Sequence, residues 1–305
     1  MSTLDEILDG LMRRYKERVP DVQGVLDAMR KEGIIQSDDD IQNDHIAFRS
    51  IGVPNLGLAS LERIFLHHGY TRRDKYFFES KRLDAYWYAP PSPQYPRIFI
   101  SELRVGDLSE EAQQIIRHYT DQVQEDPVDA LDLDDGEAVD AFLHTSGWDV
   151  PFIEDYERLL EESEYAAWTI YNRYYLNHFT VSVHTLPAPY NQLSAFNTFL
   201  EEHGFTLNDS GGKIKESPDG LLLQSSTVAE IVDALFHSRQ NPDGTAIKKR
   251  ISGSYVEFAE RRVLPEYQDL PADQVTRAHR RDGFEAGNAD KIFESTYQSQ
   301  TQQRQ

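Results

Sequence analysis

Two similar stretches decide the fold of this 305-residue chain: HIAFRSI at residues 45–51 and HFTVSVH at residues 178–184. Both alternate polar and apolar side chains, which is typical of a strand with one buried face. Each stretch begins with a histidine, and residues two apart in a strand share a face. We therefore expect His45 and Arg49 to lie on one face of a sheet, with His178 on the corresponding face of a second strand.

The sequence that follows each stretch is also similar in the two halves. A helix ending at a glycine comes next, at residues 58–68 and again at 192–203, and strand-like segments follow. The sequence thus predicts an internal repeat of order strand–helix–strand–strand–strand over about 45–105 and 178–263. The strand-like segments are residues 75–79, 84–88 and 97–105 in the first unit and 221–225 and 253–262 in the second.

We expect an α+β fold in which the two units form one mixed sheet or half-barrel, within a single domain over residues 1–296. Residues 3–31 have the spacing of two helices separated at Pro20. The remaining segments are a helical connection at 106–175, a C-terminal segment at 264–296 and a Gln- and Ser-rich tail at 297–305, which we predict to be disordered.

Composition narrows the classes of function. The net charge is −21, from 52 acidic and 31 basic residues, which argues against nucleic acid or an anionic membrane as a partner. The chain has no cysteine, so a metal would have to be bound through nitrogen and oxygen. The first ten residues are acidic and lack the apolar segment of a signal peptide, and we expect a cytoplasmic protein.

A third residue joins the two histidines. In the segment YVEFA at residues 255–259, Glu257 shares its strand face with polar and small neighbours, and a charged residue inside such a strand is costly unless it is paired or bound to a metal. Two histidines and one carboxylate leave coordination positions open, as in non-haem iron(II) oxygenases. The sequence therefore predicts an iron(II) site formed by His45, His178 and Glu257.

Other residues compete for these roles. His184 lies on the same strand face as His178, and Glu102 and Glu260 are alternatives to Glu257; Glu102 closes the first unit as Glu257 closes the second. Arg49 could pair with an acidic neighbour such as Asp44. No Gly-rich phosphate loop and no Gly-x-Ser-x-Gly motif is present, so the metal site is the candidate for chemistry.

Four motifs resemble those of the 2-oxoadipate dioxygenase/decarboxylase family, a member of the vicinal oxygen chelate superfamily with paired βαβββ units. They are NDHIAFR at 43–49, NHFT at 177–180, GSYVEFAER at 253–261 and DGFEAGNADKIFEST at 282–296. The resemblance implies that His45, His178 and Glu257 hold the metal and that Arg49 binds a substrate carboxylate. Glu257 followed by Arg261 is also similar to the last metal-binding strand of 4-hydroxyphenylpyruvate dioxygenase, which favours Glu257 over Glu260.

The resemblance implies an iron(II) enzyme that takes a 2-oxo acid and O₂, most simply 2-oxoadipate giving 2-hydroxyglutarate and CO₂, in lysine catabolism. A 2-oxoglutarate co-substrate is not needed because the substrate supplies the electrons. Two rival hypotheses are a non-redox, glyoxalase-like metal lyase or isomerase on the same fold and a binding module without activity. The first rival gains if Glu102 is a fourth ligand. The sequence indicates no oligomeric state.

Overall fold

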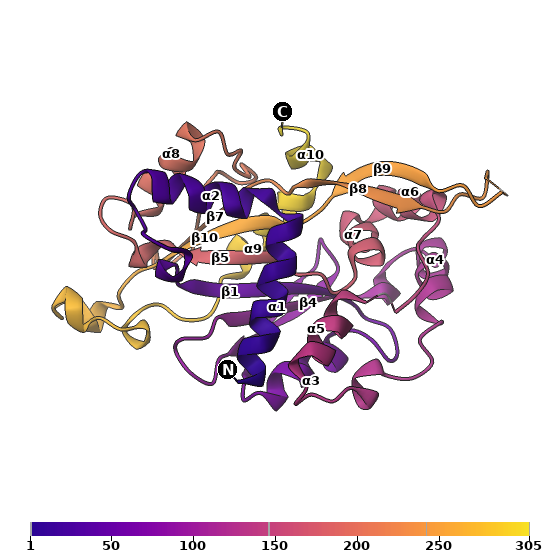
Figure 1. The fold of residues 1–305 in the computed structure, drawn as a ribbon, viewed down its shortest axis with the longest axis horizontal. Coiled ribbons are helices and arrows are strands. Elements are labelled where there is room, and N and C mark those ends of the chain that lie inside the picture. Colours follow the sequence, from indigo (N-terminus) through magenta and orange to yellow (C-terminus); the bar gives the residue numbers. More distant parts are fainter. Residues whose placement is uncertain (1, 146, 242, 305) are drawn as a thin grey trace.

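An eight-stranded mixed sheet forms the centre of the protein (Figure 1). The computed structural model describes residues 2–145, 147–241 and 243–304. The strand order is β2-β3-β4-β1-β5-β10-β7-β6, so each repeat supplies one half of the sheet. The strands are β1 (Asn43–Ile51), β2 (Thr71–Phe78), β3 (Leu83–Ala89), β4 (Arg97–Leu103), β5 (His178–Ser182), β6 (Lys215–Glu216), β7 (Leu222–Ser226) and β10 (Tyr255–Arg261).

The two halves have the same topology, which confirms the predicted repeat and the α+β fold. In each half the first strand is parallel to the last, β1 to β4 and β5 to β10. The halves meet where β1 and β5 pair antiparallel, with Ala47 opposite His178. The second half contains an insertion that the sequence did not reveal, a separate hairpin of β8 (Ile231–Phe236) and β9 (Ile247–Ser252). This hairpin extends away from the sheet beside α6 (Figure 1).

Helices cover both faces of the sheet. On one face, α3 and α8 pack through aromatic pairs, with ring centroids 5.4 Å apart for Phe48 and Phe65 and 5.3 Å apart for Phe196 and Phe258. The other face carries His45 and Arg49 and is covered by α7 and α9. Within the described part of the chain, no helix is long and apolar enough to cross a membrane. The helices are α1 (Thr3–Arg18), α2 (Pro20–Lys31), α3 (Leu58–His67), α4 (Glu110–Thr120), α5 (Gly136–His144), α6 (Ile153–Glu162), α7 (Glu164–Asn172), α8 (Leu193–Glu202), α9 (Ala286–Phe293) and α10 (Gln298–Thr301).

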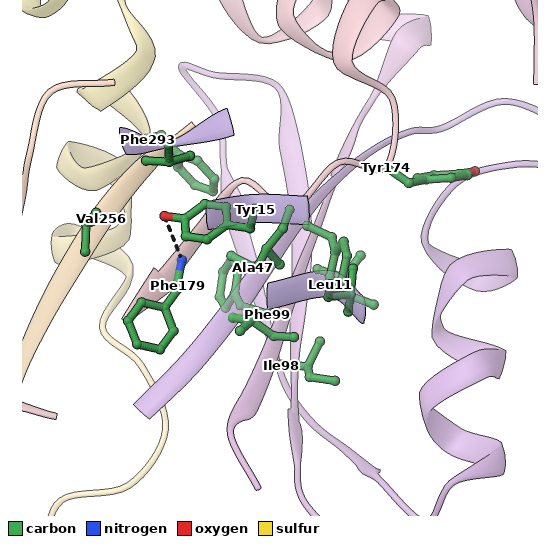
Figure 2. Close-up of a cluster of buried hydrophobic side chains, with 14 of the residues drawn as sticks. Leu11, Tyr15, Ala47, Ile98, Phe99, Tyr174, Phe179, Val256 and Phe293 are labelled. Carbon is green, nitrogen blue, oxygen red and sulfur yellow. Dashed lines mark hydrogen bonds between the residues drawn. The ribbon is translucent and has the colours of Figure 1, made fainter. Parts of the chain in front are cut away.

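A buried tyrosine of α1 joins the N-terminal helix to the second half of the sheet. The Tyr15 hydroxyl accepts the Phe179 N–H at 3.3 Å (Figure 2) and donates to the Tyr255 carbonyl. Phe179 and Tyr255 lie on β5 and β10, the strands that carry two of the three predicted metal ligands. Because the phenol satisfies backbone groups on both strands, it helps to fix their relative position.

The predicted disordered tail is wrong for residues 297–304. Gln298–Thr301 form α10, and Gln300 and Thr301 are buried. Beyond the helix, Arg304 pairs with Asp21 at 2.7 Å and with Glu230 at 2.9 Å. Polar composition suggested disorder, but these side chains bond to segments distant in the sequence, which local composition does not reveal. Residue 305 lies outside the described residues.

Candidate metal centre

The three predicted ligands converge at the middle of the sheet. His178 Nε2 lies 3.3 Å from His45 Nε2 and 3.0 Å from Glu257 Oε2, and His45 Nε2 lies 3.5 Å from Glu257 Oε1. All three side chains are buried. They form the group in the described chain whose nitrogen and oxygen atoms could hold a metal ion, with all ligand atoms within 4.8 Å of one another.

These separations fit one face of a coordination sphere. Ligand atoms ~2.1 Å from a metal lie about 3.0 Å apart at right angles and about 3.4 Å apart at tetrahedral angles. The observed distances of 3.0–3.5 Å fall on or next to this range. The donors His45, His178 and Glu257 could therefore hold one ion without rearrangement and leave its other side open.

The residue before each histidine orients its ring. The Nδ1–H of His45 donates to Asp44 Oδ2 at 2.8 Å, and the Nδ1–H of His178 donates to Asn177 Oδ1 at 3.1 Å. Because Asp44 and Asn177 accept these protons, the Nε2 lone pairs of both rings are free to face the same point. A satisfied Nδ1 and a free Nε2 are what a metal-binding histidine needs.

The carboxylate of Glu257 is held as an anion. Burial alone would raise its pKa, but His45 and His178 outweigh burial and keep the pKa of Glu257 well below its ordinary value. Burial lowers the pKa of His178, and Glu257 only partly opposes this effect. For His45, burial also lowers the pKa, but the carboxylates of Glu257 and Asp44 leave it above its ordinary value. A cation between these groups would be held by the anionic Glu257 and the two imidazole rings.

A second layer of side chains fixes the ligands. Gln224 Nε2 donates to Glu257 Oε1 at 2.7 Å, and Gln224 Oε1 accepts from Asn288 Nδ2 at 3.0 Å. Asp44 is held by Arg261, whose Nε and Nη2 donate to its two oxygens at 2.7 and 2.9 Å. Such contacts around a ligand typically change metal affinity by about 10–100-fold when they are lost.

Arg49 lies on the metal face without an acidic partner. Its Nη1 donates to Thr296 Oγ1 at 3.1 Å and its Nη2 to the Phe293 carbonyl at 3.2 Å, while Nε is buried and unpaired. Its guanidinium carbon lies 4.9 Å from the ring centroids of both Tyr165 and Trp168. In the described part of the chain, Arg49 forms no ion pair with a carboxylate.

The predicted alternative, a pair between Arg49 and Asp44, is therefore not present. Asp44 instead pairs with Arg261 and Arg97, which hold its pKa well below the ordinary value although burial alone would raise it. Arg49 is a buried cation that no carboxylate of the described residues meets at ion-pair distance, although its charge lowers the pKa of Glu164, which burial raises overall. A buried charge of this kind is costly unless a ligand completes it.

Three further residues of the site were not predicted from the sequence. The Tyr255 ring packs against the His178 ring at a tilt, with ring centroids 4.9 Å apart. Its hydroxyl is buried and has no hydrogen bond of good geometry among the described residues. Burial raises the pKa of Tyr255, while nearby Arg49 opposes the rise. Thr180 Oγ1 lies 3.1 Å from His45 Nε2, and the Phe284 ring lies edge-on to His45 at 4.7 Å. The shared strand faces of Tyr255 with Glu257 and of Thr180 with His178 were a signal for the first two.

The competing residues have other roles. Glu102 Oε2 accepts the Leu58 N–H at 2.6 Å, and Glu260 Oε2 accepts the Leu193 N–H at 2.7 Å, so each holds the first residue of a helix. His184 lies in a short 3-10 turn after β5, beside Arg261, rather than on the strand. Since Glu102 is not beside the histidines, the observation that would have favoured a four-ligand, glyoxalase-like centre is missing.

The register also corrects the predicted match between Glu102 and Glu257. Arg97 lies opposite His45 and Tyr255 opposite His178, so counting along β4 and β10 makes Glu102 the counterpart of Glu260. The counterpart of Glu257 is Phe99. The histidines obey the repeat, but the carboxylate comes from the second half alone.

Paired βαβββ units define a protein with a vicinal oxygen chelate-like fold, and its two histidines and one carboxylate on one sheet face could hold a metal ion. A glyoxalase superfamily protein of Ralstonia eutropha supports the fold assignment, with a TM-score of 0.71 at 22% identity over 91% of this chain and 84% of that one. The chain belongs to the 2-oxoadipate dioxygenase/decarboxylase family, whose sequence profile matches residues 7–274.

Two plant proteins are similar over nearly the whole chain. The chloroplastic 2-oxoadipate dioxygenase/decarboxylase of Arabidopsis thaliana is 43% identical over 301 residues, which is 95% of this chain and 76% of its own length. The crystal structure of hydroxyglutarate synthase from Oryza sativa, in complex with 2-oxoadipate, has a TM-score of 0.86 at 42% identity and covers 97% of this chain and 92% of that one. Both relatives are enzymes of the family.

Proposed function

We propose that this chain is an iron(II)-dependent dioxygenase that converts 2-oxoadipate and O₂ into 2-hydroxyglutarate and CO₂. The observation that carries the proposal is a three-ligand centre of His45, His178 and Glu257 on the same sheet face as Arg49, a buried cation without an acidic partner. Membership of the family and the 2-oxoadipate bound to the rice relative support the choice of substrate.

The donor set suits iron(II). Two imidazoles and one carboxylate are the ligands of non-haem iron(II) oxygenases, whereas Mg²⁺ and Ca²⁺ prefer oxygen ligands throughout. When bound, iron(II) supplies open coordination positions and the redox chemistry by which a 2-oxo acid reacts with O₂. The protein contributes the position of the donors, which Asp44, Asn177 and Gln224 fix through hydrogen bonds.

Arg49 supplies the recognition of a diacid. It follows His45 by four residues on one strand face, which places its Cα ~13 Å along the strand. Its long side chain can reach back towards the metal ligands, and its guanidinium can take a carboxylate with two parallel hydrogen bonds. We assign Arg49 to the carboxylate of the substrate that is farther from the metal, with the Tyr255 hydroxyl as a second donor.

Aromatic rings keep water away from the reacting centre. The Phe284 ring lies edge-on to the His45 ring, and the ring centroids of Phe99 and Phe284 are 5.0 Å apart. In such an apolar, closed site, charged hydrogen bonds are stronger than in water. Arg49 and the metal ligands can therefore hold a dianion in one orientation even though the whole chain carries a net charge of −21.

The proposal is tested by loading the protein with Fe(II) under anaerobic conditions and then adding O₂ with a panel of 2-oxo acids. We expect equal amounts of O₂ consumed, CO₂ released and 2-hydroxyglutarate formed from 2-oxoadipate, without added 2-oxoglutarate. Full turnover without O₂, or with Zn(II) in place of iron, would assign the protein to the glyoxalase-like class instead. A cytoplasmic location and a role in lysine catabolism stay predictions.

A further inference from the structure

A polar cavity lies beside Asp44, away from the three candidate metal ligands. It has a volume of about 260 Å³, and neither the two metal-site histidines nor Glu257 line it. Its walls come from the starts of β1 and β4, the ends of β5 and β10, and the segment that follows β10, gold in Figure 1, which extends past the end of the sheet. A volume under ~300 Å³ suits a ligand smaller than a drug molecule.

The lining of this cavity is strongly cationic. Arg97, Arg261, Arg277 and Arg280 line it, and among the described lining residues Asp44 is the acid that faces them. Asp44 is already engaged by Arg261, Arg97 and His45. Asp282, beside the cavity, also pairs with Arg97. Four guanidinium groups therefore face two carboxylates that are already paired, which leaves an excess of positive charge in a small volume.

Two of these arginines have unused hydrogen-bond donors. Arg97 donates through Nε to Asp282 at 2.6 Å and through Nη1 to Asp44 at 3.2 Å, but its Nη2 is buried without a partner among the described residues. Arg277 donates through Nη1 to the carbonyls of Pro93 and Tyr95, and its Nη2 is likewise buried and unpaired. Arg97 is only 2% exposed. A buried, unpaired guanidinium nitrogen is rare because it loses its hydration without replacement.

Arg261, which lines the same cavity, differs from Arg97 and Arg277 in its hydrogen bonding. Each of its three nitrogens has a partner: Nε and Nη2 donate to the two oxygens of Asp44, and Nη1 donates to the carbonyls of Arg281 and Gly283. Burial and the neighbouring Arg261 lower the pKa of Arg97 to about 10, which still leaves it cationic at neutral pH. The structural role of holding Asp44 therefore accounts for Arg261 but not for the free nitrogens of Arg97 and Arg277.

We propose that this arginine-lined cavity, formed by Arg97, Arg261, Arg277 and Arg280, binds a small doubly charged anion of the phosphate or dicarboxylate class. Planar guanidinium groups match the oxygens of both ligands with paired hydrogen bonds. The excess charge favours a dianion over chloride or acetate. The site does not depend on the reaction at the metal centre, since none of the three candidate metal ligands lines it; the two sites share Asp44 and the arginines that hold it, Arg97 and Arg261.

The test is calorimetric titration of the full, metal-loaded chain with inorganic phosphate and, separately, with succinate, at constant ionic strength set with NaCl. We expect saturable binding of one or both dianions, with weaker binding of acetate. Binding of phosphate alone identifies a phosphate-type ligand, and binding of succinate alone identifies a dicarboxylate; either supports the site when the cavity variants below weaken it and Arg49→Lys, at the metal centre, does not. Absence of saturable binding of both dianions overturns the proposal.

Variants locate the bound anion. Arg277→Gln and Arg280→Gln should each weaken binding by at least about tenfold, because each removes a charged hydrogen-bond donor from the cavity wall. Arg13→Gln, at a side chain 66% exposed on α1, is the matched control and should bind as the parent does. Arg277 also holds a loop through Pro93 and Tyr95, so if its variant does not fold, Arg280→Gln decides. Unchanged binding in Arg280→Gln would place the anion elsewhere, for instance at the metal, and would overturn the proposal.

Discussion

In the first half of the sheet, Asp44 precedes the metal-site histidine and is fixed by two arginines, whereas in the second half Asn177 takes that position. The histidines themselves are equivalent, since Arg97 and Tyr255 lie opposite them in the same register. A carboxylate makes a histidine a stronger electron donor than an amide does. The duplicated fold thus provides two ligands of the same kind but of different basicity.

The remaining functional groups are divided between the halves. Arg49 follows His45 by four residues, and its counterpart after His178 is Ser182. Glu257 belongs to the second half, and its counterpart in the first is Phe99. The first half therefore contributes the substrate-binding cation that we propose, and the second contributes the anionic ligand. Symmetry of the backbone does not require symmetry of the chemistry.

The largest effect is expected from Glu257→Ala. With only His45 and His178 left, the protein should lose its bound metal and at least ~1,000-fold of its activity. The metal content after dialysis measures the loss of metal, and the rate of O₂ uptake measures the loss of activity. Glu102→Gln is the matched control in the other half: it should keep its metal and lose only about 1 kcal/mol of stability, because it weakens the bond to the Leu58 N–H. Loss of metal in Glu102→Gln would contradict the assignment of ligands to one half.

The next effect concerns Arg49. Replacing it by Lys keeps the charge but removes the paired geometry, so kcat/KM for 2-oxoadipate should fall by at least about 100-fold. Metal content should not change. The matched control is a substrate, 2-oxohexanoate, which has the same chain length without the second carboxylate and should be used equally by parent and variant. An equal loss on both substrates would remove Arg49 from carboxylate recognition.

Exchanging the residues before the histidines tests their difference directly. Asp44→Asn makes the first half resemble the second, and we expect ~10–100-fold weaker metal affinity, measured by competition with a chelator. The reciprocal Asn177→Asp should not weaken affinity. Asp44→Asn also leaves Arg97 and Arg261 without their anion, so thermal unfolding must be followed in parallel. Equal affinities in both variants and the parent would show that the difference between the halves has no bearing on the metal.

The smallest effect is on stability at mildly acidic pH. His184 belongs to the second half, and its counterpart in the first half is Ile51. Burial lowers the pKa of His184 to about 4. An unfolded histidine has a pKa of ~6.5, so between these values the unfolded state binds more protons. Stability is therefore complete above pH ~6.5 and should fall by up to about 3 kcal/mol as the pH drops towards 4.

Denaturant unfolding of the parent and of His184→Gln over this pH range measures the contribution. The glutamine keeps an acceptor for the Arg261 N–H, which His184 Nδ1 accepts at 3.2 Å. The variant should lose less stability than the parent as the pH falls. Parallel curves for the two proteins would show that His184 does not contribute to the acid sensitivity.

The alternation in residues 45–51 and 178–184 was enough to predict the repeat and both histidines, because period-two patterns report directly on strand faces. The match of Glu257 with Glu102 failed for a different reason. Spacing along one strand does not determine the register between strands, and a shift of one residue changes which side chain faces the site. The resemblance favoured Glu257 as the ligand. Only the observed strand pairing shows that the equivalent position in the first half is Phe99.

Contacts between distant segments were the other limit. Nothing near Arg97 or Arg261 in the sequence indicates that both hold Asp44, and nothing in the polar tail indicates that Arg304 reaches Asp21. These pairs depend on the completed sheet, which brings segments far apart in the sequence side by side. Local pattern predicts which elements form, but it does not predict which charged side chains they bring together.

The antiparallel contact between β1 and β5 brings together two histidines separated by 133 positions along the chain, and the carboxylate comes from a strand later still. During synthesis, therefore, a ribosome-bound chain that has emerged only as far as the first repeat has one of the three proposed ligands, and we expect it not to retain a metal ion. Capture of the ion must wait until β10 has emerged and paired. From then on, a bound ion opposes separation of the two halves, so removal of metal should destabilise the whole sheet rather than one loop.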